Sequence, residues 1–468
     1  MKKNRLLIIM VLFMISLSFL CLCFYQVDPD YLWHIKAGEY MFQHGLLTKD
    51  VFSWSVTSKY WMSHEWLFEC IIYGLKCIFG HLHLFVYCFT NMFLLLFIIY
   101  KGNKNHLNQN IIFTLLWFAC SFILVFMMEC RPHMISNCLL ALTMYFLYDL
   151  YKNEDSKKIY FLPFISILWA NVHGGSSNLP YLLCFLFLIA GVFQFHFSKI
   201  EAKRVTKKQM IKYFSIMVLC MISVCINLHG FKMFLYPYQN MLDTTMLQNI
   251  SEWRSTTLND PSHYVYYALL LFIICIFLFS KKKIEFMDFV ILGFCAYLGL
   301  KSIRFWFYTY IIMSFIVFYY VGKRKEDKGT ELSIAIISCL FIFMFLLRGN
   351  IIIKPNYQSV LSSKDIEAVL QEQPKRLYNM YDYGGDLIYH DIPVFIDGRA
   401  DLYSRYHYKD YLNLSKLEGD YVSLMQKYDF DYLLVDKGYP IATYLKYNEE
   451  YELIYQRKKV LFYKKRTT

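Results

Sequence analysis

Long uninterrupted runs of hydrophobic residues dominate the first 350 residues of the chain. About 20 apolar residues in helical geometry cross the hydrocarbon core of a bilayer, so runs of this kind predict membrane-spanning helices. About eleven such runs are present, at residues 6–26, 82–100, 110–128, 134–151, 159–172, 179–197, 211–228, 263–280, 285–300, 304–321 and 331–348. The pattern predicts a polytopic α-helical membrane protein with about eleven transmembrane helices.

One further apolar segment, from Glu65 to Phe79, is short for a span and carries Glu65, Glu69 and Lys76. If it crossed the membrane, the basic stretch from Lys199 to Lys208 would change sides and face the outside. Short cytoplasmic loops collect Lys and Arg, so that placement would violate the positive-inside rule. We therefore predict an interfacial helix here.

From about Lys354 the pattern changes to mixed charge, with short apolar strands alternating with helical segments. Strands are predicted at 377–380, 394–396 and 432–435, and a closing hairpin at 451–455 with 460–463. Helices are predicted at 365–370, 404–414 and 421–428. The chain thus divides into a transmembrane domain at 1–350, whose outer loop 27–81 carries interfacial helices, and a C-terminal soluble α/β domain at 351–468.

Composition and charge support this division and predict how the chain is oriented in the membrane. The chain is 57% hydrophobic and 18% charged, with a net charge of +12. Residues 351–468 hold 17 basic and 17 acidic residues, so the whole excess lies in the first 350. With the N-terminus inside, every strongly basic loop falls on the cytoplasmic side. We expect a multi-pass cell-membrane protein with a cytoplasmic N-terminus and an extracytoplasmic C-terminal domain.

Several function classes fit the sequence poorly. A nucleic-acid partner is not expected, because no basic patch on one soluble face is evident. Neither a GxGxxG nor a Walker pattern occurs, which disfavours chemistry on cytosolic nucleotides. All 14 cysteines precede the C-terminal domain and lack the spacing of a metal site.

The first outer loop is rich in groups that carry chemistry. Asp28-Pro29-Asp30 follows the first apolar run directly, at the membrane edge, where ionisable residues are usually functional. The same loop holds five further candidates, Trp33, His34, Asp50, His64 and Glu65. Carboxylates take protons or bind metals, and tryptophan rings stack on sugars. The alternative is an aromatic belt with snorkelling polar groups. An aromatic belt does not need two neighbouring acids, and placing them at the membrane edge costs free energy.

Other polar residues share the predicted outer side: Arg131, His133, Asn171, His173, His229, Glu252, Arg254 and Arg304. Arginine forks suit phosphate oxygens, although arginines also anchor helix ends. A single histidine at a helix end is more often a cap, whereas three on one face indicate a shared polar cavity. Asp28 and Asp30 with a histidine would also suit Mg²⁺ or Mn²⁺, and whether a divalent cation binds is left open.

The C-terminal domain contributes Asp397-Gly398-Arg399 after a predicted strand. Turns at strand ends often bind ligands, but an Asp/Arg pair that braces the turn is the preferred interpretation. Tyr383-Gly384-Gly385 is expected to pack a helix start against the sheet.

In their order and placement these motifs resemble bacterial membrane glycosyltransferases of the GT-C superfamily. The resemblance covers nearly the whole chain and is carried by seven segments: Asp28-Pro29-Asp30, Trp33-His34, Asp50 with Phe52-Ser53, Trp66-Leu67, Arg131-Pro132-His133, Trp169 to Gly174, and Asp397-Gly398-Arg399. It implies a GT-C-like catalytic domain that uses a polyprenyl-phosphate-linked sugar on the outer face. It also implies an acidic base in the first outer loop, at Asp28 or Asp30.

The expected function is transfer of a hexose or pentose from polyprenyl phosphate to a glycan, lipid or protein acceptor of the cell envelope. Asp28 and Asp30 are the catalytic candidates, and the other polar residues named above would bind substrate. One alternative is a surface-polysaccharide polymerase or ligase with polyprenyl-diphosphate donors, which would depend more on Arg131 or Arg254. Another is a flippase or transporter, which is disfavoured because no internal repeat is evident and polar groups crowd one face.

Overall fold

The computed structural model describes residues 28–107, 130–243, 253–322 and 359–466, with residues 12, 16, 110, 113–114, 117–118 and 249–250. The helices predicted at 6–26, 110–128 and 331–348 lie wholly or largely outside these residues. The chain forms two compact units. The helical unit comprises Met1–Tyr25 and His81–Pro355, and the composite unit comprises Gln26–Gly80 and Asn356–Thr468.

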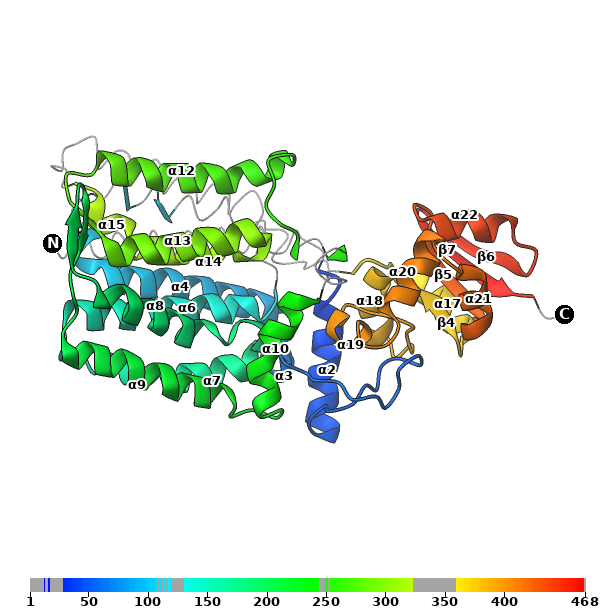
Figure 1. Cartoon of the computed structure of the whole chain (residues 1–468). Helices are drawn as coiled ribbons and strands as arrows, with labels where there is room; N and C mark the ends of the chain where they lie inside the picture. The colour runs from blue at the N-terminus through cyan, green and yellow to red at the C-terminus, as the bar shows by residue number, and fades with distance from the viewer. Residues whose placement is uncertain are drawn as a thin grey trace. The chain divides into compact units, whose positions relative to one another are not determined.

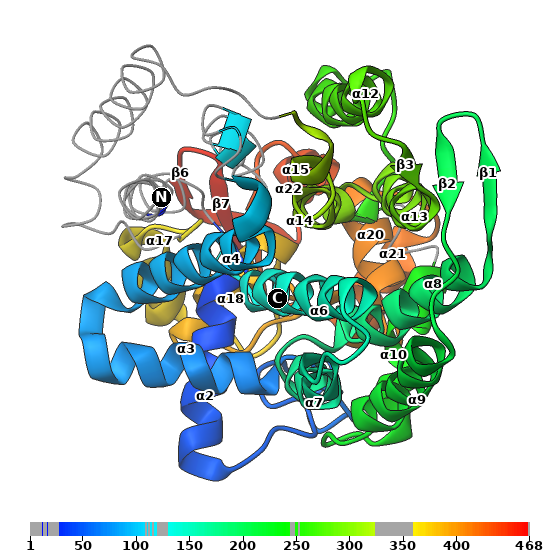
Figure 2. The same ribbon diagram turned by 90° about the vertical axis from the view of Figure 1, so that its left-hand side faces the viewer.

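The helical unit is a bundle of apolar helices (Figure 1). Its helices are α4 (His83–Leu107), α6 (His133–Lys152), α7 (Leu162–Val172), α8 (Leu179–Val192), α9 (Lys207–Val224), α10 (Phe231–Leu242), α12 (Tyr264–Phe279), α13 (Phe286–Lys301), α14 (Trp306–Ser314) and α15 (Val317–Tyr320). Helix α4 packs on α6, α8 packs on α9 and α13, and α14 packs on α6 and α13. Figure 2 shows α7 and α12 nearly end-on.

Local sequence signals begin several of these helices. Thr206 caps α9 by accepting the N–H of Gln209 at 3.2 Å, and the Gln209 side chain accepts the N–H of Thr206 at 2.9 Å. This reciprocal capping box satisfies two backbone donors that no helical carbonyl reaches. Proline lies in the first turn of α7 and of α8, where its missing N–H costs no hydrogen bond.

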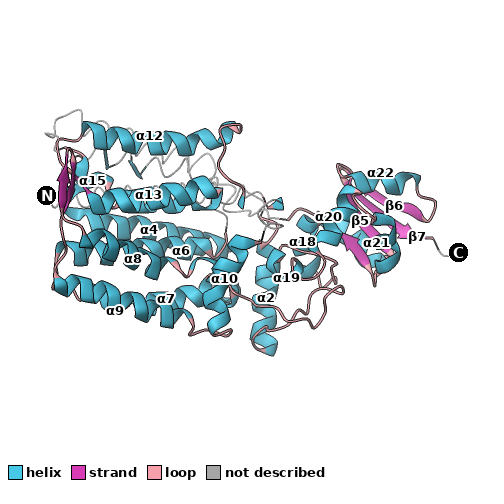
Figure 3. Cartoon of the chain, viewed as in Figure 1, coloured by secondary structure: helices cyan, strands magenta, loops and turns pink. Residues whose placement is uncertain are grey.

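A small sheet of β1 (Phe195–Phe197), β2 (Ile200–Ala202) and β3 (Ile284–Glu285) lies at one end of the helices (Figure 3). β1 pairs antiparallel with β2, and β2 pairs in parallel with β3. The apolar run predicted to be helical through residue 197 therefore ends at Val192, because its last residues pair in this sheet. The sheet and the basic stretch Lys199–Lys208 share one end of the unit, called here the basic end.

Four described helical segments are long and apolar enough to cross a membrane: Trp66–Leu107, His133–Lys152, Gly174–Val192 and Pro261–Phe279. Lys158–Val172 is an apolar helix of shorter length. The chain is a helical membrane protein, as its hydrophobic pattern predicts.

The composite unit contains a four-stranded sheet in the order β4-β5-β7-β6. β4 pairs in parallel with β5, and β7 pairs antiparallel with both β5 and β6. The strands are β4 (Leu377–Asn379), β5 (Tyr432–Asp436), β6 (Tyr451–Arg457) and β7 (Val460–Lys465). The helices are α2 (Tyr31–His44), α3 (Trp66–Phe79), α17 (Ser363–Glu372), α18 (Gly384–Tyr389), α19 (Ala400–Tyr403), α20 (Tyr408–Lys416), α21 (Tyr421–Tyr428) and α22 (Pro440–Tyr447).

The first loop is part of this unit and shares its core. Trp54 donates its indole N–H to the carbonyl of Leu377 at 3.0 Å, and Ser55 donates its hydroxyl to the carbonyl of Phe395 at 2.7 Å. The buried side chains of both segments form a single hydrophobic cluster. The division at residue 350 assigned loop 27–81 to the transmembrane domain, whereas in the structure residues 26–80 form one compact body with residues 356–468.

Most of the strands and helices predicted for the C-terminal domain are present in the structure. The strands at 377–380 and 432–435, the hairpin and the helix at 421–428 are confirmed, and the helix predicted from 404 begins at Tyr408. The strand predicted at 394–396 is wrong. Val394 forms an isolated parallel bridge with Ser53, and the Asn379 side chain binds the N–H of Phe395 and the carbonyl of Ile396.

Candidate functional site

Asp28-Pro29-Asp30 forms the turn that leads into α2. The side chain of Asp28 is fully buried, and its Oδ1 accepts the N–H of Asp30 at 3.0 Å. An aspartate that binds the backbone two residues further on makes a local turn and orients the carboxylate. Asp30 is partly exposed and stands at the N-cap position of α2. The two acids therefore have different surroundings, one enclosed and one reaching solvent.

Two glycines of the C-terminal segment lie against this turn. A Cβ placed on Gly385 would lie 2.0 Å from the carbonyl oxygen of Pro29, and one on Gly398 would lie 1.5 Å from Oδ1 of Asp30. Neither distance leaves room for a methyl group. At Gly385 the obstacle is backbone, whereas at Gly398 it is the Asp30 carboxylate, which would have to move. The motifs Tyr383-Gly384-Gly385 and Asp397-Gly398-Arg399 thus both contact the acidic turn.

Arg399 centres a buried ion network that joins the loop to the C-terminal segment. Its Nη1 lies 2.6 Å from Oδ1 of Asp50, and its Nη2 lies 2.6 Å from Oδ2 of Asp397. All three side chains are fully buried. Burial opposes the charge on the guanidinium, but the facing carboxylates raise the pKa of Arg399 well above its ordinary value. The expected Asp/Arg pair is confirmed, and the same arginine also binds Asp50.

Acidic and imidazole side chains form a second buried array beside α2. Its contacts run from Asp401 to His64 at 3.6 Å, from His64 to Glu65 at 3.1 Å, from Glu65 to His34 at 3.6 Å and from His34 to Glu69 at 3.6 Å. Among the described residues, Nδ1 of His34 and Oε1 of Glu69 have no hydrogen-bond partner. Three of the five side chains, His34, His64 and Glu65, are predicted site residues.

His64 is held between two carboxylates. Burial alone would lower the pKa of His64, but the charges and hydrogen bonds of Glu65 and Asp401 raise it to about 10. The imidazole is therefore protonated near neutral pH and links the loop to α19. This charge state favours an ion-pair role over a proton-accepting role.

Trp33 lies inside the core of the composite unit. Its side chain is 4% exposed, and its ring centroid lies 3.7 Å from that of His34 and 6.0 Å from that of Trp61. This packing encloses most of the ring surface that a sugar would use for stacking. Substrate binding by Trp33 stays a prediction.

In the helical unit, His173 and Arg304 form the centre of a polar cluster. Nη2 of Arg304 lies 2.9 Å from Nε2 of His173, whose Nδ1 lies 2.8 Å from Oγ of Ser136 and 3.0 Å from Oγ of Ser176. Arginine only donates, so Nε2 accepts and the proton of a neutral imidazole lies on Nδ1. His173 is then a neutral ring that fixes one arm of the guanidinium.

Arg304 also contacts an aromatic ring. Its guanidinium lies 5.1 Å from the ring centroid of Trp253, and the residue is partly exposed. A guanidinium fixed by an imidazole and stacked on an indole is oriented in advance to bind an anion. Ser136, Ser176 and Tyr308, whose hydroxyl lies 3.2 Å from that of Ser176, complete this cluster and were not predicted.

The other predicted residues of the helical unit lie at different places. Asn171 donates to the carbonyls of Ile167 and Ile226, which ties α7 to the end of α9. Arg254 is exposed, whereas Arg131, His133 and His229 are partly exposed. Glu252 lies outside the described residues. Substrate binding by each of them stays a prediction.

A metal site requires several ligand side chains close together. In the part of the chain that the structure describes, no group of three His, Cys, Asp or Glu side chains is arranged to hold a metal ion. Asp28 and Asp30 alone would supply two carboxylates, which is too few for a protein-held divalent cation without further ligands.

The chain shares its fold with a solved oligosaccharyltransferase. The Archaeoglobus fulgidus oligosaccharyltransferase tethered to an acceptor peptide with the NVT sequon matches with a TM-score of 0.54 and 12% identity, over 92% of this chain and 69% of that one. The apo form of the same enzyme gives a TM-score of 0.48 at 11% identity over the same shares. No protein-family model and no curated protein matches the chain. The likeness shows a shared fold, which agrees with the fold that the resemblance implies.

Proposed function

We propose that the protein is a membrane glycosyltransferase that moves a hexose or pentose from a polyprenyl-phosphate donor to a glycan, lipid or protein acceptor. Transfer takes place on the extracytoplasmic face, in the cell envelope. In this proposal the chain crosses the membrane about eleven times, with the N-terminus in the cytoplasm and the C-terminal domain outside.

The observation that carries the proposal is the pair Asp28 and Asp30, held against Gly385 and Gly398 in a chain with the fold of an oligosaccharyltransferase. Two carboxylates fixed by a tight turn and by glycine contacts are preorganised. A preorganised carboxylate accepts a proton without the cost of reordering its surroundings.

Asp30 is our candidate for the general base. It is partly exposed, so an acceptor hydroxyl can reach its carboxylate, whereas Asp28 is buried and binds the backbone of the turn. The base takes the proton of the acceptor hydroxyl as its oxygen attacks the anomeric carbon, and the sugar–phosphate bond breaks. Asp28 positions Asp30.

Departure of the polyprenyl phosphate leaves negative charge on its oxygens, which a fixed cation stabilises. Within the helical unit, Arg304 is our candidate for binding a phosphate, because His173 and Trp253 both contact its guanidinium. No step of this mechanism uses a metal ion. A divalent cation bound by Asp28 and Asp30 would need further ligands from substrate or water.

The test is transfer from a synthetic polyprenyl-phosphate sugar by purified protein with Asp28→Asn or Asp30→Asn. We expect Asp30→Asn to lower kcat by 10²-fold or more, and Asp28→Asn to have a smaller effect. Asp391→Asn is the matched control, because Asp391 is exposed and forms only a surface ion pair with Lys36.

Equal turnover of all three variants would contradict the assignment of the base. Turnover only with polyprenyl-diphosphate oligosaccharides would indicate a polymerase or ligase. Translocation of the lipid-linked sugar in proteoliposomes without any transfer would indicate a flippase.

A further inference from the structure

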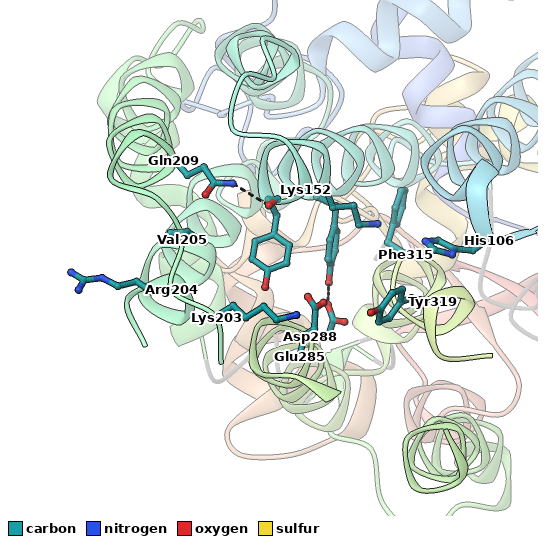
Figure 4. A pocket seen from close by; sticks show the side chains of 12 residues that line it. His106, Lys152, Lys203, Arg204, Val205, Gln209, Glu285, Asp288, Phe315 and Tyr319 are labelled. Carbon is teal, nitrogen blue, oxygen red and sulfur yellow. Dashed lines mark hydrogen bonds between the residues drawn. The ribbon is translucent and has the colours of Figure 1, made fainter. Parts of the chain in front are cut away.

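A cavity at the basic end of the helical unit has no part in the proposed transfer. Its volume is about 400 Å³, within the usual range of small-ligand pockets. α4, α6, α9, α13, α15 and β3 contribute side chains to it, together with the segment between β2 and α9 (Figure 4). Residues from these elements converge on one space that no assigned role explains.

Two carboxylates of α13 and its N-cap form one side of the cavity. Asp288 is 4% exposed and accepts hydrogen bonds from the hydroxyls of Tyr148 at 2.5 Å and Tyr320 at 2.6 Å. The Tyr151 hydroxyl binds Glu285, which is partly exposed. Among the described residues neither carboxylate forms an ion pair. Of the described lining cations, Lys203 extends toward these two acids (Figure 4), so this side of the cavity keeps an excess of negative charge.

Cationic groups occupy a different part of the lining. Lys152, Lys203 and Arg204 are all exposed, and they come from the end of α6 and from the segment before α9. Figure 4 shows Lys203 extending toward Glu285 and Asp288, Lys152 toward His106, and Arg204 away from the centre. The cavity is thus acidic in its buried part and basic at its rim.

This separation of charge excludes simple ions as the best ligand. An anion such as inorganic phosphate would satisfy the rim and would be repelled by the two carboxylates. A simple cation would satisfy the carboxylates and would be repelled by the rim. A ligand with both charges, a few bonds apart, complements both regions.

We propose that the cavity binds a headgroup in which a phosphate and a primary ammonium are joined by a short chain, as in phosphoethanolamine. The ammonium has three N–H donors for the carboxylates of Glu285 and Asp288, and the tyrosine rings beside them favour a cation. The phosphate binds Lys152 at the rim. An ethanolamine phospholipid and free O-phosphoethanolamine share this chemistry.

The test measures ligands retained by the purified full-length protein in detergent, with native mass spectrometry as the readout. Phosphatidylethanolamine, phosphatidylglycerol and phosphatidylcholine are offered in equal amounts, and free O-phosphoethanolamine is offered in a separate arm to protein stripped of lipid. We expect at least fivefold retention of the ethanolamine lipid over the other two. Binding in the separate arm alone would identify the free compound as the ligand and would support the same chemistry.

Variants then separate the two charged regions. Glu285→Gln should abolish the preference for ethanolamine over glycerol headgroups, and Lys152→Gln should weaken retention of both lipids. Glu154→Gln and Lys207→Gln are the matched controls, because both residues lie near the same end of the unit and do not line the cavity. If Glu285→Gln does not fold, the headgroup preference of the unmodified protein and the lipid retention of the Lys152→Gln variant still test the proposal.

Equal retention of the three lipids would overturn the proposal, and so would a preference for phosphatidylglycerol. Binding that Glu285→Gln and Lys152→Gln leave at the level of their controls would overturn it as well. The inference does not depend on the proposed glycosyl transfer, since no step of the assay uses a sugar donor.

Discussion

Arg399 binds Asp50 with 2.6 Å between Nη1 and Oδ1, although the two residues are 349 positions apart in the sequence. Both side chains are fully buried, and Arg399 also neutralises Asp397. Removal of one member of a buried network leaves the other charges without compensation. The stability of the composite unit therefore depends on this arginine.

We predict that Arg399→Gln lowers the free energy of unfolding by about 3–5 kcal/mol. Arg399→Lys should recover little, because one ammonium cannot reproduce the planar fork that binds both carboxylates. Thermal unfolding of the purified protein in detergent checks both variants. Arg405→Gln is the control, since Arg405 is exposed on the same segment; a similar loss in the control would show that the network is not special.

Gly398→Ala should impair catalysis without a large loss of fold. The added methyl group would lie 1.5 Å from Oδ1 of Asp30, so the carboxylate must move. A displaced base lowers kcat, and we expect a loss of about 10²-fold in the transfer assay. Gly74→Ala is the control, because a Cβ there meets only Cζ of Phe42 at 3.8 Å. Full activity of Gly398→Ala would contradict the assignment of Asp30 as the general base.

The elevated pKa of His64 predicts a dependence of stability on pH. With a pKa of about 10 in the folded protein and about 6.5 when unfolded, the ion pairs of His64 contribute fully below pH 6.5. Their contribution falls as the pH rises from 6.5 and is lost above 10. Melting temperature measured between pH 6 and 10.5 should therefore fall more steeply for the native protein than for His64→Gln.

The loss of these charged hydrogen bonds should lower the free energy of unfolding of His64→Gln by about 1–3 kcal/mol at pH 6. His44→Gln is the control, since His44 is exposed on α2. Parallel pH curves for the native protein and His64→Gln would mean that His64 is not held as an imidazolium.

Arg304→Lys should reduce transfer more than Arg254→Lys does. Arg304 is fixed by His173 and Trp253, whereas the side chain of Arg254 is exposed. A lysine keeps the charge at position 304 but loses the planar fork, and loss of one fixed donor costs about 10²-fold in kcat. Kinetics with a polyprenyl-phosphate donor compare the two variants. A larger loss of transfer in Arg254→Lys would indicate that Arg254, and not Arg304, binds the phosphate.

Elements whose signal is local could be predicted from the sequence. The hairpin of β6 and β7 and the helix α21 follow from alternation and helical spacing within a few residues. The segment at 394–396 is a continuous apolar run like that of a buried strand, but the bridge partner of Val394 is Ser53, far earlier in the chain. Long-range pairing leaves no periodic trace in either segment, so the sequence could not distinguish this bridge from a sheet strand.

The sequence also identifies some residues of the candidate site but not the contacts between them. Charge and position identified Asp28, Asp30, His173 and Arg304 as residues on one predicted side, but the contact between His173 and Arg304 arises from helix packing. Ser136 and Tyr308 lie in apolar helices, where a single hydroxyl carries little signal. The sequence predicts a helix start at Gly385 and a turn at Gly398, whereas their closeness to Pro29 and Asp30 depends on contacts between distant segments.

The composite unit is built from the first loop and the C-terminal segment, and this sets the order of events during synthesis. The ribosome makes the chain from His81 to Pro355 between the two halves, which takes roughly 15 s to a minute at about 5–20 residues per second. During that interval Asp50 has no arginine partner and the acidic turn has no glycine contacts. The carboxylates we assign to catalysis thus reach their final arrangement only after Gly398 has been synthesised.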